Sequence, residues 1–182
     1  GSSKDWYVAG NNDCKTISRY PILHSEPLSG NLVVLVDTTE ALGRPLLIFN
    51  AHTPCCSNDD GRQWEIDEML QFLGRVRAGN HDDIPSDVAV QITGDLNLVG
   101  FAQQLDSLVE GDIVNESEFG PDIEPDVDGS SLLDPFPLQT ESRLAYTWRN
   151  DWSWYWPGRL DVSSISDSVL EPGRPPVLEA LW

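Results

Sequence analysis

The segment VAVQITGDLN, residues 88–97, is a β-branched apolar run that ends abruptly in the polar turn Gly94-Asp95-Leu96-Asn97. Such a run, bounded by turn-forming residues, is typical of a buried strand. Because side chains alternate along an extended chain, Asp95 and Asn97 point the same way and offer two polar groups at one end of a sheet. The same Gly-Asp-x-Asn pattern is also ordinary turn chemistry, since Asx side chains accept hydrogen bonds from nearby backbone amides.

Two apolar runs upstream, NLVVLV (31–36) and LLIFN (46–50), are separated by a turn-like stretch and therefore predict a hairpin. A helix is expected from about residue 60 to 77, because apolar residues recur there every three or four positions. Asp59 or Asp60 is placed to cap its N-terminus. Strands mixed with helices in this way indicate a layered α/β or α+β domain.

The pattern downstream of residue 97 is weaker. A second helix is expected at 101–109. Residues 111–142 are acidic, punctuated by Pro and Gly and non-periodic, which predicts a long surface loop. Two further strands are expected at 144–148 and 159–165, on either side of a Trp-rich turn.

The composition restricts the partners. The chain has 182 residues, and 30 acidic against 11 basic side chains give a net charge of −19. The length fits one domain spanning residues 1–182. A field this negative repels polyphosphate and anionic lipid, which favours a small substrate over a long nucleic acid and suits secretion or a high-salt environment. The chain contains no apolar run of about 18 residues, so no membrane span is expected.

The three cysteines, Cys14, Cys55 and Cys56, do not have the spacing of a disulfide framework or a zinc site. Neighbouring cysteines rarely bridge each other, because disulfide geometry prefers Cα atoms about 5.5 Å apart. A bridge from Cys14 to one of the other two is the alternative to free thiols.

Two more polar clusters lie at expected strand ends. Asn50-x-His52 follows an apolar run, and Arg159-x-Asp161 opens the last expected strand. Alternation points both members of each pair toward the same face. Each pair alone has a plain structural explanation, a histidine that satisfies a loop or a surface ion pair. Together, the three clusters predict polar groups gathered at one sheet edge, where loops shape a cleft.

The order and spacing of these clusters resemble the endonuclease/exonuclease/phosphatase superfamily, which includes pancreatic-type deoxyribonuclease, sphingomyelinases and inositol-polyphosphate phosphatases. Residues 11–23 are also similar to a strand of that family. The resemblance implies a deoxyribonuclease-I-like fold, a four-layer α/β/β/α sandwich, present in part. The matching residues are Asn50-x-His52, Arg62 on the helix, Gly94-Asp95-x-Asn97, Tyr146-x-Trp148 and Arg159-x-Asp161.

The resemblance implies hydrolysis of phosphoester bonds with Mg²⁺, Mn²⁺ or Ca²⁺. Asp95 would orient or deprotonate the attacking water or help to hold the ion, and Asn97 would contact the phosphate or the ion. His52 would donate to a phosphate oxygen with support from Asn50. Asp161 would match the acid that orients the family's late catalytic histidine. Oxygen donors and a water-activating group are what phosphoester hydrolysis requires.

The chain departs from the family pattern at both ends. The family's first strands and its metal-binding glutamate should lie upstream of residue 11. Its closing Ser-Asp-His is not matched, because Ser166-Asp167-Ser168 comes too early and lacks the histidine. His24 and His81 do not stand in matching contexts. The chain therefore resembles the central and later part of such a domain. An inactive relative that binds a ligand or partner is the alternative function, and unpaired strand edges predict self-association.

The Trp-rich segment is expected either to cover the rim of the core or to form an aromatic wall for the substrate. In the second case Trp154 and Arg159 bind substrate, together with Asn50 and Arg62. A third interpretation is a calcium-binding role for the acidic loop. The alternating acids there, Asp122, Glu124, Asp126 and Asp128, lack the glycine and ligand order of a calcium-loop motif.

Overall fold

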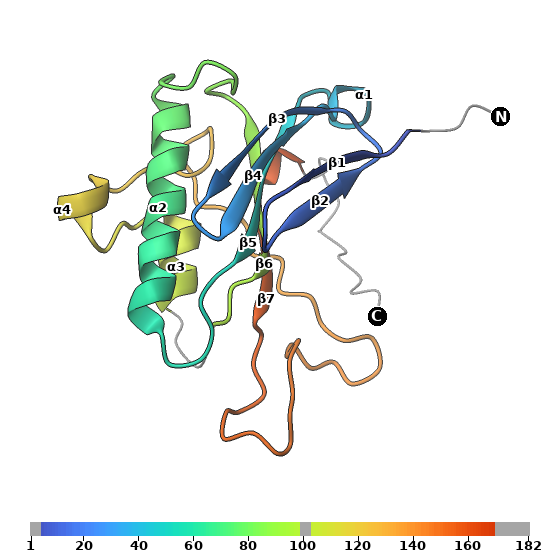
Figure 1. The fold of residues 1–182 in the computed structure, drawn as a ribbon, viewed down its shortest axis with the longest axis vertical. Coiled ribbons are helices and arrows are strands. Elements are labelled where there is room, and N and C mark those ends of the chain that lie inside the picture. Colours follow the sequence, from blue (N-terminus) through green and yellow to red (C-terminus); the bar gives the residue numbers. More distant parts are fainter. Residues whose placement is uncertain (1–4, 99–102, 170–182) are drawn as a thin grey trace.

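A computed structural model describes residues 5–98 and 103–169 of the chain. A five-stranded sheet in the order β3-β4-β5-β6-β7 forms its centre, and β1 and β2 form a separate two-stranded sheet. Helices α2 and α3 lie on one side of the large sheet, and the small sheet lies on the other (Figure 1). The described elements, in chain order, are β1 (Tyr7–Gly10), β2 (Lys15–Ser18), β3 (Ile22–Leu28), β4 (Asn31–Val36), α1 (Thr39–Leu42), β5 (Leu46–His52), α2 (Asp59–Arg77), β6 (Ala89–Asp95), α3 (Gln103–Glu110), α4 (Glu116–Phe119), β7 (Asp161–Ile165) and a 3₁₀ turn (Asp167–Val169).

Strand β4 is buried along its whole length because both of its faces are covered. Val33 and Leu35 belong to the main core, which α2 completes. Leu32, Val34 and Val36 face the other way and pack with residues of the β1–β2 hairpin. A strand buried on both faces is a continuous apolar run rather than an alternating one, which is why residues 32–36 are all Leu or Val.

Helix α2 connects the parallel strands β5 and β6 and covers the main core. Its N-cap is Asn58, whose side-chain oxygen accepts from the Gly61 amide at 3.1 Å, so the expected cap at Asp59 or Asp60 is wrong by one or two positions. Both aspartates lie in the first turn, where their charge favours the positive end of the helix dipole. The predicted helix and its amphipathic face are otherwise confirmed.

The strand pairing brings three sequence segments side by side. Strands β4 and β5 pair antiparallel, as the predicted hairpin requires, with the short helix α1 in the connection. Strand β6 pairs parallel with β5 and antiparallel with β7. The carboxyl ends of β5 and β6 therefore meet the amino end of β7 at one edge of the sheet.

Two expectations differ from the structure, and part of a third lies outside the described residues. Residues 144–148 do not form a strand; Trp148 makes only an isolated bridge to Gly158, which closes the neck of a loop outside the sheet. The long loop 111–142 contains the short helix α4. Residues 101 and 102 of the second predicted helix lie outside the described residues, and its described part is α3, Gln103–Glu110.

The cysteine expectation is also corrected. Cys55 and Cys56 are joined by a disulfide, while Cys14 is a buried free thiol. The neighbours lie in a tight turn in which Cys56 adopts a positive φ of 67°. In the described part of the chain, none of the helices is both long and apolar enough to span a membrane.

Candidate functional site

Three of the predicted catalytic residues lie in one row across the sheet. His52 is the register partner of Asp95 across the parallel β5–β6 pair, and Asp95 is the partner of Asp161 across the antiparallel β6–β7 pair. Directly paired residues point to the same face of a sheet, so these three side chains share one edge and one face. We call His52, Asp95 and Asp161 the polar row. His52 and Asp161 are exposed, and Asp95 is half-buried.

Asn50 lies on the same face, two residues before His52, and pairs in register with Thr93. Its amide nitrogen donates to the Lys15 carbonyl at 3.0 Å and to the Thr16 hydroxyl at 3.2 Å. Both acceptors belong to β2, so Asn50 fastens the hairpin to the large sheet beside the polar row. This placement fits a supporting role more directly than a substrate contact.

Gly94 is required by the close approach of β5 and β6 just before the polar row. Its φ is 141°, in the region that favours glycine, and a Cβ built there would collide with the carbonyl oxygen of Ala51. Ala51 is its register partner. Any side chain at this position would push apart the two strands that present His52 and Asp95.

The turn after Asp95 locks the two strand ends together. The Asn97 backbone amide donates to Asp95 Oδ1 at 3.0 Å, and Asn97 adopts a positive φ of 49°. Its side-chain amide donates to the Thr53 carbonyl at 2.9 Å, and the Thr53 hydroxyl donates to the Leu96 carbonyl at 2.6 Å. The Gly-Asp-x-Asn motif is therefore a turn. It still leaves Asp95 Oδ2 and Asn97 Oδ1 without a hydrogen bond among the described residues.

The oxygen atoms around the polar row suit a hard divalent cation. Two carboxylates, Asp95 and Asp161, face the same side, and the Asn97 amide oxygen is close to Asp95 in sequence. Carboxylate and amide oxygens are ligands for Mg²⁺, Mn²⁺ or Ca²⁺. The ligand atoms of the three polar-row residues do not all lie within 4.8 Å of one another. This arrangement fits an ion held by one or two carboxylates, with water and substrate completing its shell, better than an all-protein cage.

Two residues that the sequence patterns did not single out, Asn31 and Glu65, connect the backbone of His52 to helix α2. Asn31 is fully buried; its side-chain oxygen accepts from the His52 backbone amide at 2.8 Å, and its amide nitrogen donates to Glu65 Oε2 at 2.8 Å. Burial raises the pKa of Glu65, the nearby charges of Glu68 and Asp13 add to the increase, and the bond from Asn31 opposes it. The only sequence signal was an amide at the start of an otherwise apolar strand.

Arg62 is not brought to the polar row. Its side chain is fully buried, and its guanidinium donates to the carbonyls of Pro54 and Cys56 at 2.9 and 3.0 Å. It also donates to Gln104 at 3.2 Å and pairs with Asp59. The arginine therefore holds the turn around the disulfide, and every one of its nitrogens is engaged inside the protein.

A cavity of about 660 Å³ lies beside the polar row. Its lining includes Asn97, Trp154 and Arg159, but His52, Asp95 and Asp161 are not among the described residues around it. Leu160 and Val162, which alternate with Asp161, do line it. Alternation along β7 therefore places the cavity and the polar row on opposite faces of the same sheet edge, with Asn97 common to both.

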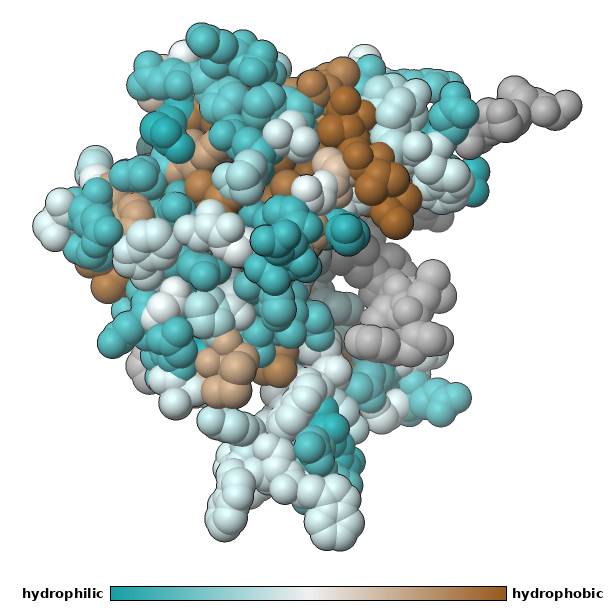
Figure 2. All heavy atoms as spheres, in the orientation of Figure 1, coloured by the Kyte–Doolittle hydropathy of each residue, from teal (hydrophilic) through white to brown (hydrophobic). Residues whose placement is uncertain are grey.

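The wall of the cavity is mostly apolar and aromatic. Trp154 is fully exposed, at 100 %, within a loop that projects from the lower end of the molecule (Figures 1 and 2). Arg159 pairs through two nitrogens with Asp134 and lies 4.8 Å above the ring of Phe136. Its Nε is buried and has no partner among the described residues. Among the described residues that line the cavity, Arg159 is the one charged residue, and its charge is paired with Asp134.

The acidic loop uses its carboxylates for local structure. Asp122 accepts from the Ile113 amide at 2.8 Å, and Asp128 accepts from the Ser130 amide at 3.0 Å. Asp126 is buried, and its two oxygens accept from the amides of Val127 and Asp167. These bonds give three of the four alternating acids, all but Glu124, a role in local structure.

No protein-family model and no curated protein matches the chain. Among solved structures, beta toxin from Staphylococcus aureus is similar with 15 % identity and a TM-score of 0.51, over 84 % of this chain and 52 % of the toxin chain. TDP2 from Caenorhabditis elegans is similar with 12 % identity and a TM-score of 0.55, over 89 % and 47 %. Sphingomyelinase C from Streptomyces griseocarneus is similar with 12 % identity and a TM-score of 0.52, over 87 % and 54 %.

The chain spans about half the length of these structures. At such low identity the likeness concerns the fold alone. It confirms the fold class that the sequence motifs predicted: the chain has a mixed α/β fold of the deoxyribonuclease-I-like type, in part.

Proposed function

We propose that the chain contributes the phosphate-binding residues of a hydrolase that cleaves phosphoester bonds with the help of a divalent metal ion. The observation that carries this proposal is the polar row, because three residues from segments up to 109 positions apart become direct register partners at one sheet edge. A row of one imidazole and two carboxylates provides a donor and anionic oxygens on one face of the sheet, and these are the groups that phosphoester hydrolysis uses. The name of one structural neighbour, sphingomyelinase C, is consistent with this chemistry.

Each residue of the row has a distinct task in this proposal. The exposed imidazole of His52 donates to a phosphate oxygen, and Asn31 fixes the backbone from which it projects. Asp95 directs its unbonded Oδ2 to the attacking water or to the cation, because Oδ1 is engaged by the Asn97 amide. Asp161 supplies a second carboxylate beside it. A bound Mg²⁺ or Mn²⁺ would neutralise charge that develops on the phosphoryl oxygens.

The net charge of −19 favours a small phosphoester over a long nucleic acid. The cavity on the other face offers a place for the apolar part of such a molecule, next to Asn97. Trp154 would cover that part, and Arg159, whose charge is paired with Asp134, would contact it from the cavity wall. A suitable substrate has a phosphoryl group that binds at the polar row and an aromatic or lipid-like leaving group that binds in the cavity.

The experiment is hydrolysis of bis(p-nitrophenyl) phosphate by the purified chain with Mg²⁺ or Mn²⁺, followed by addition of EDTA. The proposal expects turnover that EDTA abolishes and that the Asp95→Asn variant lowers at least about a hundredfold. Asp106→Asn, an exposed aspartate on α3 outside the site, is the matched control and retains full activity. Equal activity of Asp95→Asn and Asp106→Asn would reject the proposed role of the polar row.

A second candidate function is ligand binding without catalysis. The observation that favours it is that the cavity and the polar row lie on opposite faces, so a ligand can fill the cavity without contacting His52 or Asp161. Tryptophans line the cavity, so binding of a phosphorylated aromatic compound would quench their fluorescence. Saturable quenching with no metal-dependent turnover supports this function, and turnover supports the first.

We also propose that two copies associate through strand edges. Strands β3 and β7 are the outer strands of the large sheet, and exposed hydrophobic side chains accompany the hairpin and β3, including Val8, Ile17 and Leu23. Figure 2 shows hydrophobic residues gathered at the surface at the upper right, the side on which Figure 1 places the hairpin. Light scattering that gives the mass of a monomer at 100 µM would refute this proposal.

A further inference from the structure

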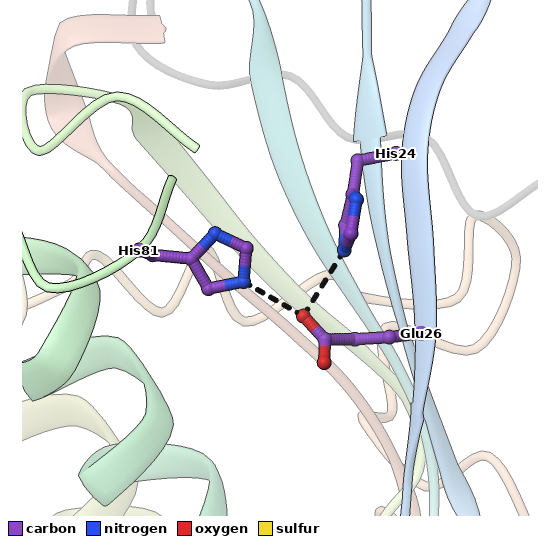
Figure 3. A group of neighbouring side chains, drawn as sticks. All are labelled: His24, Glu26 and His81. Atoms are coloured by element: carbon purple, nitrogen blue, oxygen red, sulfur yellow. Dashed lines mark hydrogen bonds and ion pairs between the residues drawn. The ribbon is translucent and has the colours of Figure 1, made fainter. Parts of the chain in front are cut away.

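Two histidines and a glutamate converge on the opposite face of the large sheet from the polar row. Figure 3 shows the imidazoles of His24 and His81 both directed at Glu26. His24 Nε2 lies 3.1 Å and His81 Nε2 lies 2.9 Å from the same oxygen, Glu26 Oε1. One ligand atom from each residue lies within 4.8 Å of the other two. Two ligands bound to tetrahedral zinc at about 2.0 Å are separated by about 3.3 Å, so these atoms are already near the spacing of a coordination shell.

The three side chains are held by different parts of the fold. His24 and Glu26 are two residues apart on β3, so both point to the face covered by α2. His81 belongs to the connection between α2 and β6. Its ring packs against the buried Phe72 ring at 5.5 Å and edge-on against His24 at 5.3 Å. Aromatic packing therefore fixes both imidazoles before any ligand binds.

We propose that His24, Glu26 and His81 form a site for a zinc ion or a similar borderline transition-metal ion. Imidazole nitrogen with one carboxylate is a donor set that suits Zn²⁺ better than Mg²⁺ or Ca²⁺. The three residues are half-buried, which leaves room for a water molecule as the fourth ligand. This site has no part in the proposed hydrolysis.

The surroundings of His24 favour metal binding through its Nε2 atom, whereas His81 gives up one hydrogen bond when a metal binds there. The Asp83 carboxylate lies 3.3 Å from His24 Nδ1, an arrangement in which a second carboxylate orients a ligating imidazole. The Asp83 backbone amide donates to His81 Nδ1 at 3.3 Å, and this long bond is lost when a metal at Nε2 places the proton on Nδ1. Binding also replaces the two hydrogen bonds to Glu26 Oε1 by bonds to the ion.

The site is distinct from the polar row in position. Glu26 pairs with Val33, and Val33 pairs with Phe49, which lies three residues before His52 on β5. The cluster faces α2, whereas the polar row faces away from it. An ion here would tie the segment after α2 to the outer strand β3. We therefore expect it to stabilise the fold without taking part in phosphoester hydrolysis.

The experiment is a thermal melt of the EDTA-treated and dialysed chain with and without ZnCl₂. Zinc at a hundred times its Kd is expected to raise Tm by about 5–10 °C. His81→Ala and Glu26→Gln should each remove this increase. His52→Ala is the matched control, because it deletes the chain's other histidine outside the cluster and should keep the increase. Co²⁺ provides a readout that does not depend on unfolding, since tetrahedral nitrogen and oxygen ligation gives visible absorption bands.

An increase in Tm that His81→Ala and Glu26→Gln retain would overturn the proposal, because zinc would then bind elsewhere. Absence of both the Tm increase and the Co²⁺ bands in the unaltered chain would also overturn it. If His81→Ala is unfolded, the Co²⁺ spectrum of folded Glu26→Gln decides, and unchanged bands in that variant count against the site. None of these results bears on the activity assay, which depends on Asp95.

Discussion

Removal of the Asn31 side chain tests the connection between the core and the polar row. Asn31 makes one hydrogen bond to a backbone amide and one to the Glu65 carboxylate, and it is fully buried. A neutral bond contributes about 0.5–1.5 kcal/mol and a bond to a charged group about 1.5–3 kcal/mol, so Asn31→Ala should lower the free energy of unfolding by about 2–4 kcal/mol.

The loss should depend on pH with a defined sign. The bond from Asn31 lowers the pKa of Glu65, which means that it stabilises the ionised carboxylate. Burial nevertheless leaves the pKa of Glu65 above its ordinary value, so ionisation of Glu65 opposes folding. The stability that protonated Glu65 contributes is therefore lost as pH rises through the folded pKa. The bond is therefore stronger above that pKa, where the carboxylate is ionised, and Asn31→Ala should be more destabilising at pH 8 than at pH 4.

Urea denaturation of the unaltered chain and of Asn31→Ala at both pH values measures this difference. Glu65→Gln is the partner variant for a double-mutant cycle, because it has no carboxylate to ionise. In the Glu65→Gln background the effect of Asn31→Ala should be the same at both pH values. A destabilisation below about 0.5 kcal/mol, or one independent of pH with Glu65 intact, would refute the reasoning.

Three further changes have expected outcomes. Gly94→Ala should lower the free energy of unfolding by more than about 4 kcal/mol in urea denaturation, because its Cβ collides with Ala51. Gly43→Ala, also at positive φ but in open space, should lower it by about 1 kcal/mol, and similar losses in the two variants would contradict the steric argument. Arg62→Lys should lower Tm strongly through lost buried bonds, and reduced substrate affinity at unchanged Tm would instead indicate substrate contact. Burial acts to raise the pKa of Glu26, but hydrogen bonds from His81 and His24 outweigh burial and leave the pKa below its ordinary value. The stability that ionised Glu26 contributes is therefore lost as pH falls through its folded pKa. Glu26→Gln should therefore lose less Tm than the unaltered chain between pH 6 and pH 3, and equal losses would contradict the assignment.

The central sheet was predictable because its signals are local. The runs at 31–36, 46–50 and 88–93 are apolar and β-branched, and each is bounded by turn residues, so β4, β5 and β6 follow from composition and period. The polar residues at their ends were visible for the same reason. The hairpin β1–β2 was less visible, since its strands have four residues each and expose Val8 and Ile17.

The roles that depend on distant partners could not be predicted. Arg62 on an amphipathic helix has the same sequence signature whether it binds substrate or, as here, bonds to carbonyls of the preceding turn. His24 and His81 are 57 positions apart, and only the fold brings them to one carboxylate. Trp148 and its neighbours have the composition of a strand, but the sheet edge beside β7 is occupied by a single bridge from Leu133 instead. In each case tertiary contacts override local preference.

The most direct test of the central claim is paramagnetic broadening by Mn²⁺ in the ¹H–¹⁵N spectrum of the chain, because it locates a divalent ion without requiring turnover. If His52, Asp95 and Asp161 form one metal- and phosphate-handling edge, low concentrations of Mn²⁺ should broaden the amides of residues 50–53, 94–97 and 160–163 first. Asp95→Asn should weaken that broadening, and Asp106→Asn should not. Broadening centred on the acidic loop, or spread evenly over the acidic surface, would contradict the account.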